Sequence, residues 1–565
     1  MKSLPVLLLA ALALPAFAQT PSAPASAAAP FPVSITVDAA KSVGPLRPVW
    51  RFFGADEPNY ATMKDGRKLL TQLGQLGKPQ VYFRAHNLLT SGDGTPALKW
   101  GSTNAYTEDA QGNPVYDWTV VDHIFDTYLA RGIKPYAQIG FMPKALSTHP
   151  EPYQHEWRPG LPYNEIYTGW AYPPKDYKKW EELCYQWVKH CVERYGKAEV
   201  ESWYWETWNE ANIGYWKGTP EEFRQTHDFA IAGVKRALPT ARVGGPDSAG
   251  HGGEWMHDFI EHCLRGTNHA TGQKGTPLDF ISFHAKGAPS FVDGHIRMGI
   301  APHLATIDRG FQIVASYPET KNTPIIIGES DPEGCAACQG PSFSYRNGTV
   351  YSSYTAASFA RKHDLADKHG VNFEGALTWA FTFEDQPYFA GFRQLASNGL
   401  PLAVLNVFRL MGRMEGDRLA ATSSAQVPLD AILKDGVRGA PDVGVLAARS
   451  GHRATVMVWH YHDDDLAGPA AEVSLVVSGL PAGVSIARLQ HHRVDEFHSN
   501  AYGEWKRMGS PLAPNRQQYD QLLAASNLAT LADAPATVAV EGGKADLKFS
   551  LPRQGVSLLT LDWSE

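Results

Sequence analysis

The sequence predicts a (β/α)8 barrel followed by an all-β domain, and three observations lead to this prediction. Eight short apolar runs alternate with amphipathic stretches between about residues 51 and 385. That number of runs fits a (β/α)8 barrel, in which strands buried on both sides are nearly continuously apolar. After about residue 417 the chain changes to short β-branched runs separated by Gly, Pro and Asp, which is typical of a β-sandwich.

The first residues have the features of an export signal. A basic start at Lys2 precedes an apolar run from Leu4 to Ala16, and small residues follow at Ala16-Phe17-Ala18. We expect residues 1–18 to be a signal peptide and the Pro/Ala/Ser-rich residues 19–31 to be a disordered linker. The protein is therefore expected to be exported, to the periplasm or to the medium. No stretch reaches the roughly 20 apolar residues that a membrane span requires.

The remaining chain divides at two positions. Residues 32–47 are expected to form a strand that joins the β-sandwich, residues 48–416 the barrel and residues 417–565 the sandwich itself. No sequence period indicates a solenoid. A doubly wound dinucleotide-binding sheet is the alternative to the barrel, but no GxGxxG follows an early strand. The predicted barrel strands are RFFGAD, QVYFRAHN, KPYAQIGFMP, ESWYWETWNEAN, ARVGGPDS, DFISFHAKG, TPIIIGESDP and FEGALTWAFTFED, in chain order.

Composition narrows the classes of partner. The chain has 51 basic and 58 acidic residues, a formal net charge of −7, and no block of like charge, which argues against a nucleic-acid surface. No motif requires a cofactor, and we expect no metal. The WHYHDDD run that begins at Trp459 has a metal-like composition, but a strand end with a solvated turn explains it equally well.

Five cysteines allow at most two disulfides. Cys184 and Cys191 lie seven residues apart in one predicted helix, too far apart to bridge, and are expected to be packed thiols. Cys335 and Cys338 lie in a short loop that a local disulfide can close, although free thiols remain the alternative.

Polar residues gather where the predicted strands end, and in this fold the carboxyl ends of the strands face one rim. Glu210 follows the aromatic WYWETWN stretch, and Glu329 ends the apolar TPIIIG run. A carboxylate at such a position is costly to bury without partners, so the alternative for each is a salt bridge or a solvated loop. Two carboxylates that meet in one cleft are the minimal machinery of glycoside hydrolysis, and oligosaccharides are then the expected substrates.

The chain resembles glycoside hydrolase family 39. The residues that carry the resemblance are RAH at 84–86, TWNEAN around Glu210, FHAKG around His284 and IGESDP around Glu329, and YGEWKRMG extends it into the β-domain. The resemblance implies a retaining mechanism in which Glu210 is the general acid/base and Glu329 the nucleophile. It also implies that Asn209, His86 and His284 contact the sugar.

Other residues have weaker assignments. Arg84 is expected to brace a catalytic carboxylate. Phe141, Trp379 and Phe383 could form platforms for the sugar ring or could simply pack in the core. Glu384 and Asp385 could hold distal hydroxyls or could be solvated loop carboxylates.

The identity of the sugar depends on Lys286. Two activities in the family compete, β-xylosidase and α-L-iduronidase, and a uronic acid requires a cation that xylose does not. Lys286 could bind such a carboxylate, with Arg393 as a second cation, or could form an ion pair with Glu384 or Asp385. The QPYFAGFRQLASNG stretch resembles the bacterial xylosidases. We therefore expect an exo-acting β-D-xylosidase; an acidic-sugar glycosidase is the second reading, and a non-catalytic carbohydrate-binding protein is the third. The β-domain could bind carbohydrate independently or buttress the barrel.

Overall fold

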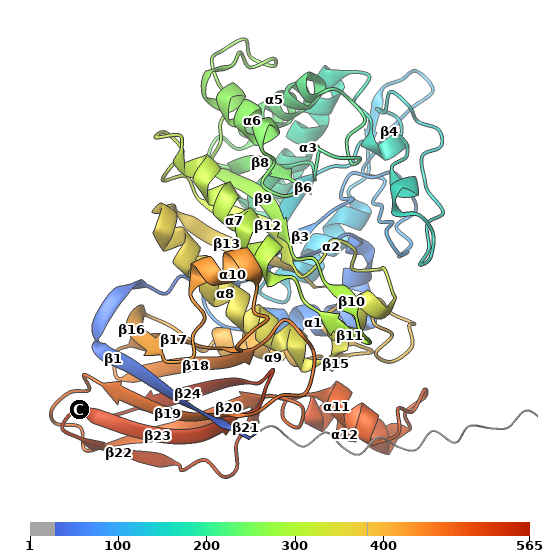
Figure 1. Ribbon diagram of the computed structural model, residues 1–565. Coiled ribbons are helices and arrows are strands. Elements are labelled where there is room, and N and C mark those ends of the chain that lie inside the picture. Colours follow the sequence, from blue (N-terminus) through green and yellow to red (C-terminus); the bar gives the residue numbers. More distant parts are fainter. Residues whose placement is uncertain (1–28, 381, 565) are drawn as a thin grey trace, which may run out of the picture.

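The computed structural model describes residues 29–380 and 382–564, which form two domains packed on one another (Figure 1). The predicted signal peptide and most of the predicted linker lie outside the described residues. Within the described residues, no helix combines the length and the apolar character needed to cross a membrane.

The first domain is a closed barrel of eight parallel strands, and each strand comes from one of the predicted apolar runs. In order around the barrel they are β2 (Phe52–Ala55), β3 (Tyr82–Ala85), β6 (Lys134–Ile139), β7 (Tyr204–Thr207), β8 (Arg242–Ser248), β9 (Phe280–Lys286), β12 (Ile325–Asp331) and β13 (Phe373–Trp379). Because β13 pairs with β2, the sheet has no edge. The predicted (β/α)8 barrel is confirmed, and the doubly wound alternative is excluded.

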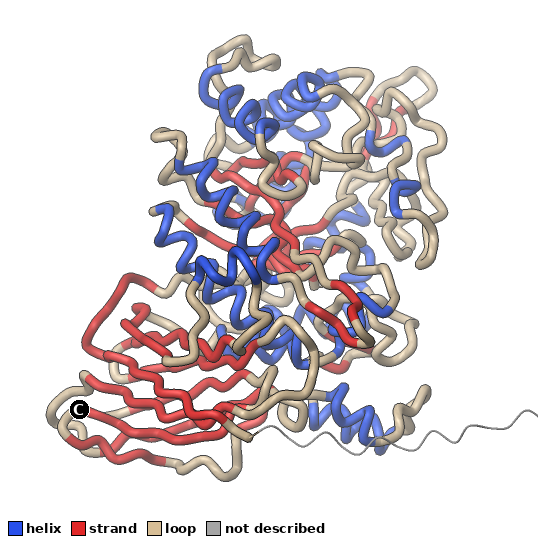
Figure 2. Tube along the Cα trace, in the orientation of Figure 1, coloured by secondary structure: helices blue, strands red, loops and turns tan. Residues whose placement is uncertain are grey.

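One long helix follows each barrel strand and covers the outside of the barrel (Figure 2). These helices are α1 (Lys64–Gly74), α2 (Thr119–Leu129), α3 (Tyr177–Tyr195), α5 (Pro220–Ala237), α6 (Glu254–Arg265), α7 (Ile300–Ala315), α8 (Thr349–His369) and α9 (Ala403–Met411). Local sequence fixes some of their starts. Thr219 and Glu222 form a capping box that satisfies two backbone amides at the start of α5.

Shorter elements occupy the connections. The hairpins are β4 (Tyr106–Glu108) with β5 (Pro114–Tyr116), β10 (Ser290–Val292) with β11 (His295–Arg297), and β14 (Ala396–Ser397) with β15 (Leu400–Pro401). The short helices include α4 (Lys197–Val200), α10 (Leu429–Asp435), α11 (Ala501–Arg507) and α12 (Arg516–Ala525).

The second domain is a mixed sheet that closes on itself. Its strands are β1 (Phe31–Pro45), β16 (Asp417–Ser423), β17 (Asp442–Ser450), β18 (Arg453–Tyr461), β19 (Ala471–Ser478), β20 (Ile486–Val494), β21 (Ala529–Thr530), β22 (Thr537–Glu541), β23 (Lys544–Leu551) and β24 (Val556–Asp562). The pairing of β20 with β24 closes the ring, a feature that the sandwich prediction did not include.

Strand β1 belongs to this sheet although it lies next to the barrel in sequence. It runs parallel to β19 and antiparallel to β16, and Figure 1 shows it in blue among the orange and red strands. Its buried and outward-facing residues alternate as far as Ala39, so that Val33, Ile35 and Val37 are buried in the core of the second domain.

The two domains share a core and buried polar contacts. Trp459 and Tyr461 of β18 belong to the same buried cluster as the barrel residues. Arg361 of α8 forms an ion pair of 2.9 Å with Asp442, both nearly fully buried. The side-chain amide of Asn406 in α9 donates to the carbonyls of Ser499 and Ser526, each at 2.9 Å. The β-domain therefore supports the outer helices of the barrel.

The cysteines follow the sequence expectation. Cys335 and Cys338 form a disulfide in the loop after β12, whereas Cys184, Cys191 and Cys263 are buried thiols. Burial raises the pKa of each of these three thiols well above its usual range, so they are kept unreactive.

Candidate active site

Two carboxylates meet at the carboxyl end of the barrel. Glu210 follows β7, and Glu329 lies within β12 on the other side of β8 and β9. One carboxylate oxygen of each, together with a ring nitrogen of His284, lies within 4.8 Å of the others. The side chains are 16% and 7% exposed, so both are shielded yet reachable. This separation is shorter than the roughly 6.5–9.5 Å of inverting glycosidases.

Arg84, at the end of β3, binds several polar side chains at the base of the site. It is completely buried; its Nε donates to Glu206 at 2.5 Å, and one terminal nitrogen donates to Asn209 Oδ1 at 3.0 Å and to Asp247. Its other terminal nitrogen lies 3.7 Å from Glu329. The expected bracing contact is therefore present, but Arg84 holds Glu206 and Asp247 more tightly than Glu329.

His284 of β9 bridges two carboxylates. Its Nδ1 lies 2.8 Å from Glu210 Oε1, and its Nε2 lies 2.8 Å from Asp247 Oδ2. Burial opposes the charged ring, but Asp247, Glu329 and Glu210 outweigh it and raise the pKa of His284 to about 10. The ring is therefore an imidazolium at neutral pH and donates from both nitrogens.

Glu329 is surrounded by cations. Burial alone would raise the pKa of its carboxyl, but the positive charges of His284, Lys286 and Arg84 hold that pKa well below its usual range. Glu329 is consequently an ionised carboxylate at neutral pH, the form that a nucleophile requires.

Lys286 pairs with partners other than those considered from sequence. Its Nζ lies 2.6 Å from Glu329 and 3.0 Å from Asp331, and neither ion pair involves Glu384 or Asp385. The predicted ion pair of Lys286 with Glu384 or Asp385 is therefore wrong. The Lys286 side chain instead contacts residues of β12, the strand next to its own in the barrel. Arg393 is fully buried and binds Asp331 and Glu333, so it supports this group from behind.

His86 occupies the next position around the rim. Arg84 donates to its Nε2 at 2.9 Å, and its Nδ1 lies 3.1 Å from Asp56. Burial and the charge of Arg84 lower the pKa of His86 to about 3, so this ring is neutral. Two histidines that looked alike in sequence thus have opposite charge states.

The three predicted platforms differ in position. Phe141 and Trp379 are buried, and each packs edge-on against His86, with ring centroids 5.7 and 5.0 Å away. Phe383 is also buried and packs edge-on against Tyr60 and Phe392. The structure therefore brings Phe141 and Trp379 to the wall of the site, with Phe383 in the neighbouring aromatic group.

The predicted carboxylates after β13 lie further along the rim. Glu384 accepts a hydrogen bond of 2.8 Å from the amide of Asp65 at the start of α1. Asp385 is exposed, with a left-handed backbone φ of 59°. Contact of either residue with substrate remains a prediction.

Sequence reasoning missed four residues of the site: Asp56, Lys99, Glu206 and Asp247. Asp247 was detectable, because it ends a predicted strand in the same way as Glu329. Glu206 points into the barrel beside Tyr136 Oη, 2.6 Å away, and burial with Asp247 nearby raises the pKa of its carboxyl. Lys99 lies in an irregular loop and pairs with Asp56, and no periodic sequence pattern predicts this contact.

A parallel barrel with paired acidic residues at the ends of β7 and β12 defines this protein as a glycosidase of the barrel type. The chain belongs to glycosyl hydrolases family 39, whose family model matches residues 33–544.

β-Xylosidases and α-L-iduronidases are both among the relatives of the chain. It is 28% identical over 466 residues to a β-xylosidase of Geobacillus stearothermophilus, covering 79% of both chains. It is 25% identical over 539 residues to the α-L-iduronidase of Mus musculus, covering 88% of this chain and 76% of that relative. The crystal structure of a β-xylosidase from Caulobacter crescentus shares the fold, with a TM-score of 0.72 at 23% identity over 94% of this chain and 99% of the other.

Proposed function

We propose that the protein is a retaining exo-glycosidase in which Glu329 is the nucleophile and Glu210 the general acid/base. The observation that carries the proposal is the approach of their carboxylate oxygens to within 4.8 Å, with Glu329 held ionised by its cationic neighbours. Carboxyl groups of retaining enzymes stand about 5–5.5 Å apart, which leaves no room for a water between them.

The proposed reaction has two displacements. Glu329 attacks the anomeric carbon while Glu210 gives its proton to the leaving oxygen, which produces a glycosyl ester on Glu329. Water then attacks the same carbon, Glu210 accepts its proton, and the sugar leaves with its configuration retained. His284 donates to Glu210 and limits its orientation, because its other nitrogen is fixed by Asp247.

Asn209 is proposed to bind the 2-hydroxyl of the sugar. Its Oδ1 accepts from Arg84, which fixes the amide orientation, and its Nδ2 is buried without a hydrogen-bond partner among the described residues. A buried donor without a partner is costly, so it is positioned to bind a ligand.

For the glycone we favour β-D-xylose. Each lysine of the site already has a carboxylate partner: Lys286 pairs with Glu329 and Asp331, and Lys99 pairs with Asp56. Their charges are therefore balanced within the protein, which suits a neutral sugar. The similarity to the Geobacillus β-xylosidase points the same way.

An acidic sugar is the second candidate, and one observation favours it. The Lys286 side chain is 18% exposed beside the proposed nucleophile, so its ammonium could reach a sugar carboxylate as well as Asp331. The similarity to the mouse α-L-iduronidase is consistent with this reading.

The mechanism and the sugar have separate tests. In Glu329→Ala we expect no turnover, and azide should restore cleavage of activated aryl glycosides with an inverted glycosyl azide as product. Wild-type turnover without azide would refute the assignment.

For the sugar, hydrolysis of aryl β-D-xyloside should exceed that of α-L-iduronide, β-D-glucoside and α-L-arabinoside, whereas preference for the iduronide would reverse our choice.

A further inference from the structure

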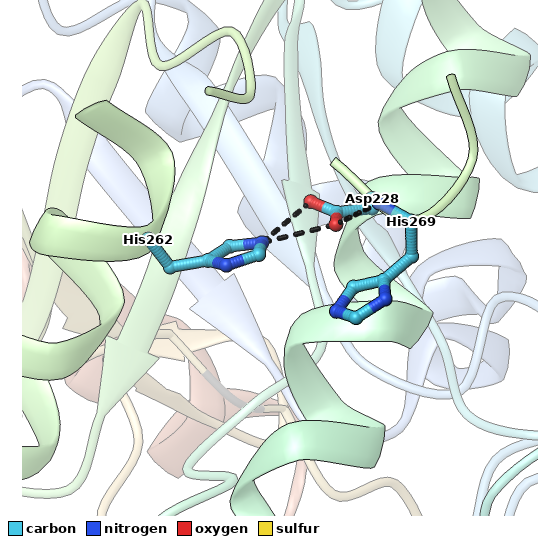
Figure 3. A group of neighbouring side chains, drawn as sticks. All are labelled: Asp228, His262 and His269. Atoms are coloured by element: carbon cyan, nitrogen blue, oxygen red, sulfur yellow. Dashed lines mark hydrogen bonds and ion pairs between the residues drawn. The ribbon is translucent and has the colours of Figure 1, made fainter. Parts of the chain in front are cut away.

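Three side chains converge on the outside of the barrel, in a group that the proposed reaction does not use. Asp228 lies in α5, His262 in α6 and His269 in the loop that follows α6 (Figure 3). One carboxylate oxygen or ring nitrogen from each lies within 4.8 Å of the other two. Two histidines and a carboxylate are a common ligand set for zinc.

The distances between His262 and Asp228 are close to those between two ligands of one zinc ion. His262 Nε2 lies 3.0 and 3.1 Å from the two oxygens of Asp228, as the dashed lines of Figure 3 show. Bonds of about 2.0–2.1 Å to zinc place neighbouring ligand atoms of a tetrahedron roughly 3.3 Å apart. The His269 ring stacks on His262 with centroids 5.6 Å apart, and its Nε2 forms an ion pair of 2.8 Å with Glu221 Oε1.

A simple hydrogen-bond cluster explains only part of this arrangement. Asp228 accepts from the Thr276 hydroxyl at 2.5 Å and from the His269 amide at 2.8 Å, and these two bonds already attach the loop of residues 266–276 to α5. Neither bond involves the two imidazole rings, which stack on each other beside this carboxylate. In a metal site, such bonds to a ligating carboxylate fix its orientation.

The group is also open to solvent from one side. The Asp228 side chain is fully buried, that of His262 is 9% exposed and that of His269 is 30% exposed. An ion can therefore enter past His269 and reach a ligand that is already fixed in place.

We propose that Asp228, His262 and His269 bind one Zn²⁺. Loops that follow the helices of a (β/α)8 barrel lie at the end opposite the catalytic rim. The ion would thus tie the 266–276 loop to α5 and α6 and stabilise the barrel without contacting substrate.

The test is metal binding by the whole chain, without a histidine tag, after chelator treatment. Titration with Co²⁺ as a spectroscopic probe should give the absorption of a tetrahedral site, and calorimetry with Zn²⁺ should give one ion per chain. His269→Ala should weaken Zn²⁺ affinity by more than about tenfold and abolish the rise in Tm that Zn²⁺ produces. The matched control is His257→Ala, which removes a histidine of α6 that contacts Tyr317, and it should bind as the wild type does.

Two results would overturn the proposal. One is wild-type protein that binds neither ion. The other is unchanged binding in His269→Ala, which would place the ion elsewhere, for example at Glu210, His284 and Glu329, where three ligand atoms also approach one another.

Discussion

Glu210 and Glu329 have the same side chain, but their surroundings give them different chemistry. Glu329 lies 2.6 Å from Lys286, 3.7 Å from Arg84 and 3.8 Å from His284, whereas Glu210 forms its ion pair with His284 at 2.8 Å. The concentration of positive charge on one carboxylate stabilises its anion. This asymmetry supports the proposed roles of the two residues, and it leads to two predictions for single residues.

The first concerns Glu210→Ala. Aryl glycosides with good leaving groups need no proton, so they should still form the glycosyl-enzyme, while substrates with poor leaving groups should lose roughly 10²–10⁴-fold in kcat/KM. Azide should then accelerate breakdown of the intermediate and give a product of retained configuration. Equal losses for good and poor leaving groups would show that Glu210 is not the acid.

The second concerns pH and His284. Its pKa of about 10 in the folded protein lies above the unfolded value of about 6.5, so its contribution to stability is complete below pH 6.5 and is lost as the pH rises towards 10. In denaturant titrations between pH 7 and 10, wild-type stability should therefore fall more steeply than that of His284→Gln, by at most about 1.4 kcal/mol per pH unit.

His86→Gln is the matched control for that experiment. Because the pKa of His86 is about 3, this ring is neutral throughout the range, and its replacement should leave the wild-type slope unchanged. Identical slopes for wild type and His284→Gln would contradict the ionised state of His284.

At the scale of elements, the site depends on how closely β12 passes Asp247. A Cβ at Gly328 would collide with Asp247 Oδ1 and come within 3.3 Å of His284. Asp247 cannot move away, since Arg84 and His284 hold it and it is fully buried. Position 328, directly before Glu329, therefore has room only for glycine.

Gly328→Ala should accordingly destabilise the protein by about 1–3 kcal/mol and lower kcat. Gly334→Ala, in the loop after the same strand, places its Cβ where no atom lies within 4 Å and should be nearly neutral. Thermal unfolding and initial rates of the two variants, measured side by side, test this. A Gly328→Ala enzyme with wild-type rate and Tm would mean that Asp247 can shift.

The strands also show which parts of the fold could be predicted from the sequence. Buried parallel strands are continuous apolar runs, so all eight barrel strands could be predicted, and with them the rim positions of Glu210 and Glu329. Strand β20, with the sequence IARLQHHRV, differs from the β-branched runs of the second domain because polar residues interrupt it, so neither this strand nor its closing pair with β24 could be predicted. Pairings such as Arg84 with Glu206 and Lys286 with Asp331 depend on neighbouring strands, and no local pattern encodes them.

For the whole molecule, the shared core predicts that the domains do not fold separately. Removing residues 1–45 deletes β1 and leaves β16 and β19 with unpaired edges, which favours aggregation. Removing only residues 1–30 leaves β1 intact. We expect the shorter deletion to be soluble and active and the longer one to be insoluble, as judged by gel filtration and activity after identical expression. A soluble, active protein without β1 would show that the ring is dispensable.

Strand β1 also has a consequence for biosynthesis. Its partners lie far along the chain: Ser34 contacts Ser424, 390 residues later, and Val37 contacts Ser478, 441 residues later. At about 5–20 residues per second, a ribosome needs roughly 20–80 s to complete the first of these contacts. Strand β1 is therefore synthesised early, but it can pair with β16 and β19 only after most of the chain has been made. During that interval the apolar residues of β1 have no core in which to be buried; they are Val33, Ile35 and Val37. The polar residues that alternate with them make the unpaired strand less prone to self-association; they are Ser34, Thr36 and Asp38.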